Sequence, residues 1–207
     1  LPEVTQTRLD SLFELLNLEI EKCLSWNPES PDVSGNHPPD VENKPVAEHI
    51  VTLFLEEVPS LRKQLRDDAI AMYDGDPAAK SLVEVVLSYP GFLAVMGYRI
   101  AHFFYSHNVP LIPRMFTEIV HAQTGIDIHP GAQIGASFCI DHGSGIVIGE
   151  TAVIGNHVKL YQGVTLGAFS VKKGMDKGQR HPTLHDNVTV YAMSTILGGN
   201  TVVGENA

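Results

Sequence analysis

Acidic residues, histidines and one arginine gather in the second half of this sequence. The set comprises Asp127, His129, Asp141, His142, Arg180 and His181. A neutral imidazole accepts a proton from an alcohol near pH 7, and a carboxylate on its other nitrogen fixes the tautomer and stabilises the imidazolium. No serine or cysteine nucleophile accompanies these residues in an obvious arrangement. The pattern therefore predicts acid–base catalysis on a hydroxyl group that belongs to the substrate.

A repeat of six residues contains most of this set. Large aliphatic side chains recur at Ile128, Ile134, Ile140, Ile148, Ile154, Leu160 and Leu166, with a slip of two residues after Ile140. Glycine follows four of these seven positions, where a small residue lets the backbone turn a corner. A six-residue period is typical of a parallel β-helix, whose short strands stack coil on coil. An amphipathic helix would repeat at three and four residues and a β-sandwich at two, and neither pattern is present.

The repeat also predicts where the acid and the base lie relative to each other. Asp127 and His142 are fifteen residues apart. With three hexapeptides per turn, this spacing puts them on nearly adjacent corners of successive coils. We therefore expect their side chains to be in contact.

The residues before the repeat are patterned as helices. Apolar side chains recur at spacings of three and four over residues 9–24, and again over 50–65, 82–105 and 111–120. Pro90 and Gly91 divide the third of these stretches into two. The N-terminal part of the chain is therefore predicted to be all-α.

These patterns give an α + β chain with two domains. We predict a helical domain over residues 1–124, with a polar linker or loop at 26–44, and a parallel β-helix over residues 125–207. A loop at 168–180 interrupts the repeat, and loops that leave a solenoid usually carry function. The sequence stops within a repeat unit at Ala207, so we expect further coils or a capping tail beyond it.

Composition narrows the function classes. The net charge is −10 and the basic residues are scattered, which argues against nucleic-acid binding. No apolar run is long enough to span a membrane and the N-terminal residues do not resemble a signal peptide, so a cytoplasmic location is expected. Cys23 and Cys139 lie in different kinds of element and have no cysteine at metal-ligand spacing, so neither a disulfide nor a thiolate metal site is expected.

Several motifs resemble one family closely. They are Asp76-Pro-Ala78, Gly97-Tyr-Arg-Ile-Ala-His102, Gly125-Ile-Asp-Ile-His-Pro130, the run from Ile140 to Gly155, Val164-Thr-Leu-Gly167 and Arg180-His-Pro182. Together they resemble the serine acetyltransferases, hexapeptide-repeat enzymes that transfer acetyl from acetyl-CoA to the hydroxyl of L-serine in cysteine biosynthesis. The resemblance covers roughly residues 70–207 and implies a left-handed β-helix.

The resemblance also implies roles for particular residues. His142 matches the general base and Asp127 the carboxylate that orients it. Asp76 and Asp141 match the acids that hold the substrate ammonium. Arg180 matches the guanidinium that clamps the substrate carboxylate, an arrangement suited to a zwitterion.

Further positions follow in the same way. His181 matches a second histidine near the substrate, and Gly167, Ala168, Ala192 and Met193 match backbone along the CoA arm. The family has Gly-Gly where this chain has Gly167-Ala168. No resident metal is implied.

The resemblance implies a homotrimer about the β-helix axis, or a hexamer of two trimers, with sites between subunits. Many family members bind O-acetylserine sulfhydrylase through a C-terminal tail, which this sequence does not include. Cysteine would inhibit if it competed for the same ammonium and carboxylate clamps.

Three alternatives stay open. β-Helix trimers also include zinc carbonic anhydrases. In such an enzyme, the zinc ligands would come from His129, His142, His157 and His181. An acetyltransferase for homoserine would use the same clamps, whereas a sugar acceptor would leave two acids and an arginine unexplained. A non-catalytic scaffold conflicts with the Asp127 and His142 pair.

Overall fold

The computed structural model describes residues 2–26, 43–169 and 178–207. Most of the expected linker at 26–44 and of the expected loop at 168–180 lies outside the described residues. The described helices are α1 (Pro2–Leu24), α2 (Asn43–Gly75), α3 (Leu82–Ser88), α4 (Pro90–Ser106) and α5 (Ile112–Thr124).

Local sequence signals account for several helix ends. The Ser81 side chain caps α3 by accepting a hydrogen bond from the backbone N–H of Glu84. Pro90 occupies the first turn of α4, where its missing N–H costs nothing and its fixed φ favours the helix. Gly125 ends α5 with a φ of 68°, a left-handed conformation that glycine adopts easily. The expected division at Pro90 is therefore confirmed. The stretch expected over residues 50–65 lies within one continuous helix, α2, which contains Pro59.

Eleven short strands follow α5 in the described residues. They are β1 (Asp127–Ile128), β2 (Gln133–Ile134), β3 (Cys139–Asp141), β4 (Val147–Ile148), β5 (Val153–Ile154), β6 (Lys159–Tyr161), β7 (Thr165–Gly167), β8 (Thr183–Leu184), β9 (Thr189–Val190), β10 (Thr195–Leu197) and β11 (Val202–Val203).

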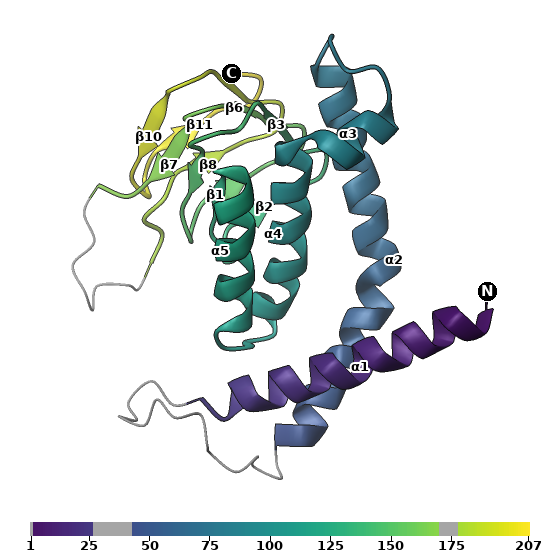
Figure 1. Ribbon diagram of the computed structural model, residues 1–207. Helices are drawn as coiled ribbons and strands as arrows, with labels where there is room; N and C mark the ends of the chain where they lie inside the picture. The colour runs from purple at the N-terminus through teal and green to yellow at the C-terminus, as the bar shows by residue number, and fades with distance from the viewer. Residues whose placement is uncertain (1, 27–42, 170–177) are drawn as a thin grey trace.

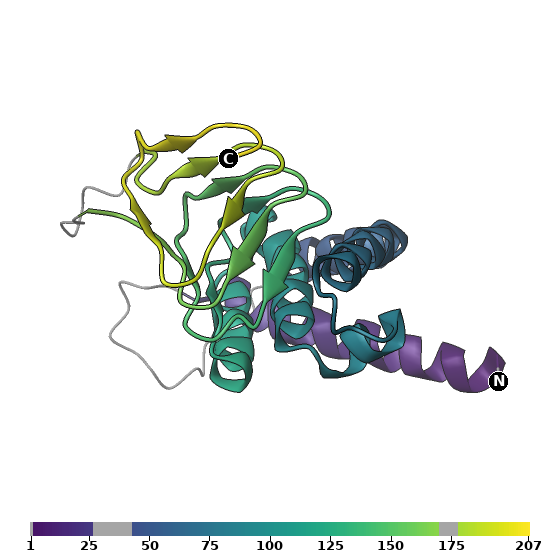
Figure 2. The same cartoon turned by 90° about the horizontal axis from the view of Figure 1, so that it is seen from above.

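These strands form three parallel sheets, in the orders β1-β4-β7-β10, β11-β8-β5-β2 and β3-β6-β9. Each turn of the chain adds one strand to each sheet, so the three sheets are the sides of a coil. Figure 2 shows successive coils lying one over another. The prediction of a left-handed parallel β-helix is confirmed.

The predicted repeat positions point into the coil. Ile128, Ile140, Ile148, Leu160 and Leu166 are all at most 3% exposed. Burial of aliphatic side chains on this scale is the main favourable term in folding a solenoid.

The two-residue slip lengthens one coil at a corner. Asp127 pairs with Val147, whereas Val147 pairs with Thr165, so the first coil is two residues longer than the second. The extra residues lie between β3 and β4, in the segment that contains His142. The irregularity in the repeat therefore falls at a candidate catalytic residue.

The helices cover one side of the coils. In Figure 1, α4 and α5 lie side by side next to the strands, and the long α2 runs beside α4. One core joins α2, α4 and α5 to the coil interior through residues such as Met72, Val95 and Val120. A second core holds α1 against α2 and α4 and includes Ile20 and Phe104.

A buried ion pair fixes this junction. Asp68 of α2 accepts hydrogen bonds from Arg99 of α4 at 2.6 and 2.8 Å, and from the backbone N–H of Phe138 at 2.9 Å. Arg99 also donates to the carbonyl of Gly135 at 2.8 Å. Two helices are thus tied to the first coil by a single pair of side chains.

Within the described ranges, no single helix is long and apolar enough to cross a membrane. Only α3 and α4 taken together pass that test of length and composition, and they are bent by 72° relative to each other.

Candidate functional site

Asp76 lies immediately after α2, in the turn that leads to α3. Its Oδ1 accepts a hydrogen bond from the backbone N–H of Ala78 at 2.8 Å. Its Oδ2 accepts one from the hydroxyl of Tyr89, between α3 and α4, at 2.6 Å. These two bonds, with the nearby charges of Lys159 and His142, lower the pKa of Asp76. The Asp76 carboxyl is therefore held ionised in a fixed orientation.

The hydrogen bond between Tyr89 and Asp76 also changes the pKa of Tyr89. Its hydrogen bond to Asp76 raises the pKa of Tyr89 to about 12. Its hydroxyl consequently remains a donor across the physiological range.

Asp141 comes to the same region from the end of β3. Its Oδ2 forms an ion pair with Nζ of Lys159 on the neighbouring strand β6 at 2.9 Å. Its Oδ1 lies 3.7 Å from Nε2 of His142. Both side chains of the Lys159 pair are less than a fifth exposed.

His142 stands at the lengthened corner between β3 and β4. Its φ is 60°, and Gly143 and Gly145 follow with φ of 89° and 78°. A left-handed conformation is uncommon for a residue with a Cβ, and here it turns the chain sharply after the strand. The His142 side chain is 73% exposed. An imidazole presented this way is accessible to a substrate.

A second group of side chains surrounds Arg180 and His181. Arg180 forms an ion pair with Glu150. Nδ1 of His181 accepts a hydrogen bond from the backbone N–H of Thr151 at 3.1 Å, which places the ring proton on Nε2. Burial, followed by the positive charge of Arg180, lowers the pKa of His181. The His181 ring is therefore neutral near pH 7.

Glu150 is part of the same network. Burial opposes its ionisation, but the hydroxyl of Tyr105 and the charges of His129 and Arg180 outweigh that effect and lower its pKa. Tyr105 donates to Glu150 at 2.7 Å. A charged Glu150 thus stabilises the guanidinium of Arg180.

Asp127 lies with this second group. A cavity of about 420 Å³ is lined by Asp127, His129, Arg180 and His181 among others. Burial lowers the pKa of His129, as it does for His181. Two arginines, two carboxylates and two imidazoles with lowered pKa values therefore line one cavity.

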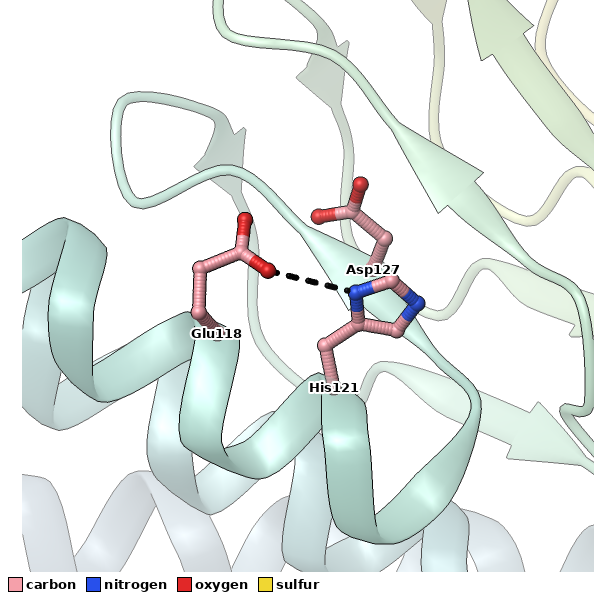
Figure 3. A group of neighbouring side chains, drawn as sticks. All are labelled: Glu118, His121 and Asp127. Atoms are coloured by element: carbon pink, nitrogen blue, oxygen red, sulfur yellow. Dashed lines mark ion pairs between the residues drawn. The ribbon is translucent and has the colours of Figure 1, made fainter.

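Figure 3 shows Asp127 facing Glu118 and His121 of α5. Their ligand atoms lie within 4.8 Å of one another, and no other such group of three occurs in the part of the chain that the structure describes. Arg114 forms an ion pair with Glu118 and lies 3.9 Å from Asp127. The guanidinium of Arg114 already neutralises these carboxylates, so the group of Glu118, His121 and Asp127 is not a metal site.

The six predicted side chains fall into two groups. Asp76, Asp141 and His142 lie together, and Asp127, Arg180 and His181 line or adjoin the other cavity. Among the described residues, no ion pair or hydrogen bond joins Asp127 to His142. Asp127 pairs with Val147, so one turn of the first coil takes 20 residues, and the fifteen residues from Asp127 to His142 fall five short of it. Asp127 lies in β1, whereas His142 lies at the corner between β3 and β4.

The positions expected along the CoA arm flank one pair of strands. Gly167 and Ala168 lie at the end of β7, and Ala192 and Met193 precede β10, the parallel partner of β7. Met193 has a φ of 63° and a side chain that is 77% exposed.

The four histidines of the zinc alternative do not converge within one chain. None of His129, His142, His157 and His181 belongs to the group of three potential ligands found among the described residues. The two cysteines are free, and burial raises the pKa of Cys139 to about 12, so its thiol is a weak nucleophile.

Sequence reasoning missed Lys159, Tyr89 and Glu150. Lys159 and Glu150 are charged residues within the repeat, so the criterion that identified Asp141 would also have selected them. Tyr89 lies outside the repeat and gave no such signal.

The fold places the chain among the hexapeptide-repeat proteins of the left-handed β-helix class. Sequence and structural comparisons make the assignment more specific. The profile described as the N-terminal region of serine acetyltransferase matches residues 38–96. A plasmid-encoded serine acetyltransferase of Synechococcus elongatus is 44% identical over 199 residues, which are 94% of this chain and 62% of that protein. A serine acetyltransferase of Staphylococcus epidermidis is 45% identical over 150 residues, which are 70% of this chain and 68% of that protein.

Experimental structures agree with these matches. Serine acetyltransferase isoform 3 of Entamoeba histolytica, in complex with cysteine, has a TM-score of 0.80 and 40% identity, covering 97% of this chain and 63% of that one. The Neisseria gonorrhoeae enzyme in complex with serine has a TM-score of 0.68 and 30% identity, covering 94% and 72%. The chain belongs to the serine acetyltransferase family. It spans about three fifths of the length of several curated relatives that it matches.

Proposed function

We propose that this chain carries the acceptor site of a serine O-acetyltransferase, which transfers acetyl from acetyl-CoA to the hydroxyl of L-serine. The observation that carries the proposal is the first group, in which two carboxylates, Asp76 and Asp141, lie beside the exposed imidazole of His142. Paired carboxylates suit an ammonium group, and an imidazole next to them suits a hydroxyl on the same small molecule. Family membership and the serine and cysteine complexes of relatives support it.

The proposed reaction is a direct transfer. The imidazole of His142 takes the hydroxyl proton of serine as the oxygen bonds to the thioester carbonyl carbon. The carbon–sulfur bond then breaks, and the departing thiolate takes the proton from the imidazolium to give CoA and O-acetyl-L-serine. We assign Asp127 to orienting His142, and since Asp127 lies with Arg180 in the second group, this Asp127 would belong to a neighbouring subunit.

Arg180 and His181 complete the proposed site. The guanidinium of Arg180 would clamp the serine carboxylate, with Glu150 fixing its orientation. We assign Gly167, Ala168, Ala192 and Met193 to the CoA arm, since they flank one strand pair. The protein's own contribution requires no resident metal.

The separation of the two groups supports a site shared between subunits. We propose a homotrimer, or a hexamer of two trimers, in which His142 of one subunit faces Arg180 of its neighbour. Residues 1–124 and 125–207 would act as separate helical and β-helical domains in that assembly. A cytoplasmic location and binding of a sulfhydrylase through a tail outside this sequence belong to the same proposal.

The first test measures thiol release from acetyl-CoA with L-serine, L-homoserine or no acceptor. Release that depends on L-serine supports the proposal, and a preference for L-homoserine would change the acceptor. If neither amino acid supports thiol release, the proposed acetyltransferase function is refuted. Metal analysis would then test the carbonic anhydrase alternative. His142→Ala should lower turnover at least a hundredfold with serine. Near-normal turnover in that variant would remove His142 from the role.

A second test addresses the shared site. Equal amounts of His142→Ala and Arg180→Ala subunits are refolded together and assayed with L-serine. If each site takes His142 and Arg180 from different subunits, random mixing leaves roughly a quarter of the sites intact. Each variant refolded alone is the control. No recovery above those controls would place both residues of a site in one subunit.

L-Cysteine carries the same ammonium and carboxylate as L-serine. We expect it to inhibit competitively with serine through Asp76, Asp141 and Arg180, which steady-state rates at several serine concentrations would show. A rate that is independent of cysteine would contradict this assignment.

A further inference from the structure

The ammonium of Lys159 lies between the two acidic residues of the first group. Its Nζ is 2.9 Å from Oδ2 of Asp141 and 2.6 Å from the carbonyl oxygen of Gly75. Gly75 is the last residue of α2 and directly precedes Asp76. One cation therefore contacts the carboxylate that ends β3 and the backbone that presents Asp76.

Lys159 is restrained on its remaining sides. Its Nζ lies 4.5 Å from the centroid of the Tyr161 ring, a cation–π contact. The Tyr161 ring is stacked on Tyr191 at 5.2 Å and 7°. The Lys159 side chain is only 17% exposed. A long flexible side chain thus has its ammonium confined to one position.

The charge of Lys159 is retained in this position. Burial favours the neutral amine, but the contacts with Asp141 and Tyr161 outweigh it, and the pKa of Lys159 is raised. The ammonium also contributes to the lowered pKa of Asp76. Two carboxylates and one ammonium leave a net charge of about −1 for a ligand to neutralise.

We propose that Lys159 is a positioning residue that sets how the acceptor's ammonium is bound. It fixes the separation of Asp76 and Asp141 through the Gly75 carbonyl, and it offsets one of their two charges. The site is thereby matched to a single ammonium group. This inference rests on the proposed function, because it concerns the acceptor of that reaction.

Removal of Lys159 has a defined consequence. Without the ammonium, the two carboxylates repel each other, and the end of α2 loses its link to β6. Acceptor binding should weaken, whereas the imidazole of His142 and the CoA positions are untouched. We expect a KM for L-serine about tenfold higher, the effect of one charged hydrogen bond, with kcat within about threefold.

The experiment compares three substitutions with the wild-type protein. Lys159→Met removes the charge and keeps the aliphatic stem. Lys159→Gln keeps a donor for the Gly75 carbonyl without the charge. Lys159→Arg keeps the charge with a different shape. Lys22→Met is the matched control, since Lys22 forms an exposed pair with Glu19 in α1.

The readouts are kcat and KM for L-serine and for acetyl-CoA, the dissociation constant of L-serine by calorimetry, and the melting temperature. We expect Lys159→Met and Lys159→Gln to raise the serine KM and dissociation constant together, with the acetyl-CoA KM unchanged. Lys159→Arg should recover part of the loss, and Lys22→Met should match the wild type. If Lys159→Met does not fold, Lys159→Gln carries the same test.

The outcomes separate this inference from the proposed function. A wild-type protein that neither acetylates nor binds L-serine would refute both. An active wild-type protein with an unchanged serine KM in Lys159→Met would overturn the role of Lys159 alone. A lower melting temperature or kcat without a change in serine binding would also overturn it, because that pattern is structural.

Discussion

The buried pair of Asp68 and Arg99 provides the most quantitative test of how this fold is held together. Asp68 is fully buried and Arg99 is 5% exposed. Arg99→Met keeps the aliphatic volume but leaves the Asp68 carboxylate without its partner, with only the N–H of Phe138 as donor. Removing one member of a buried ion pair typically costs about 3–5 kcal/mol. We expect Arg99→Met to lower the free energy of unfolding by that amount.

The assay is urea unfolding followed by circular dichroism at one fixed protein concentration, because subunit association would make stability depend on concentration. Asp68→Asn, which strands the Arg99 charge instead, should cost a similar amount. The double variant Asp68→Asn/Arg99→Met should cost much less than the sum of the two, because the single changes act on one interaction. Glu19→Gln, in the exposed pair with Lys22, is the control and should change stability by less than about 1 kcal/mol.

The pair should also affect the site. Asp68 lies eight residues before Asp76, about two turns of α2. Loosening of that helix end in Arg99→Met should raise the KM for serine at temperatures where the variant remains folded. A loss of less than about 1 kcal/mol in Arg99→Met, or additive costs in the double variant, would refute the reasoning that this pair holds the helices on the first coil.

Four further predictions concern single side chains. Tyr89→Phe removes the donor that lowers the pKa of Asp76, so L-serine affinity measured by calorimetry should fall more steeply than in the wild type as the pH approaches about 4. Gly149→Ala should raise the serine KM, because a methyl group at Gly149 would overlap the His181 ring. Leu166→Ala should lower the free energy of unfolding by about 2–5 kcal/mol, since Leu166 is fully buried in the coil. The lowered pKa of His181 means that the unfolded chain binds a proton more readily than the folded one, so stability should fall as the pH drops below about 6.5, and His181→Gln should reduce that fall.

Each of these four has a contrary result. Parallel pH profiles of serine affinity for Tyr89→Phe and the wild type would mean that the hydroxyl does not control Asp76. An unchanged serine KM in Gly149→Ala would remove His181 from the acceptor site. A cost below about 1 kcal/mol for Leu166→Ala would mean that the coil collapses around the cavity. If the stability of His181→Gln falls with pH as steeply as that of the wild type, groups other than His181 cause the fall.

The β-helix could be predicted because its signal is local and repeated. One aliphatic position in every six, as at Ile128 and Leu166, specifies the interior of the coil without reference to any distant residue. The helices could also be predicted from a local pattern, in which apolar residues recur at spacings of three and four. The break at Pro90 was part of that prediction. The stretch predicted over residues 50–65 lies within α2, which continues through Pro59 because packing on both sides of a proline can maintain a helix.

The candidate site could be predicted residue by residue but not as an arrangement. Asp127 and His142 were expected in contact because fifteen residues were compared with a uniform coil. The slip after Ile140 lengthens that coil at the corner containing His142, and the two side chains lie in different groups. A single irregularity in a repeat therefore changes which residues face each other, although it leaves every strand in place.

Lys159 shows why the remaining contacts depend on tertiary packing. The repeat places Lys159 beside Cys139 and Tyr161 beside Asp141 on neighbouring strands, so their columns follow from the sequence once the register is known. The contact between these strands and the end of α2 does not follow from the sequence repeat. The end of α2 is brought there by the buried ion pair and by the core that joins α2 to the first coil. The Gly75 carbonyl meets the Lys159 ammonium only after that docking. The geometry of Asp76 and Asp141 is thus a property of the helix–coil junction, and substitutions at Arg99 and at Lys159 should disturb acceptor binding through the same contact.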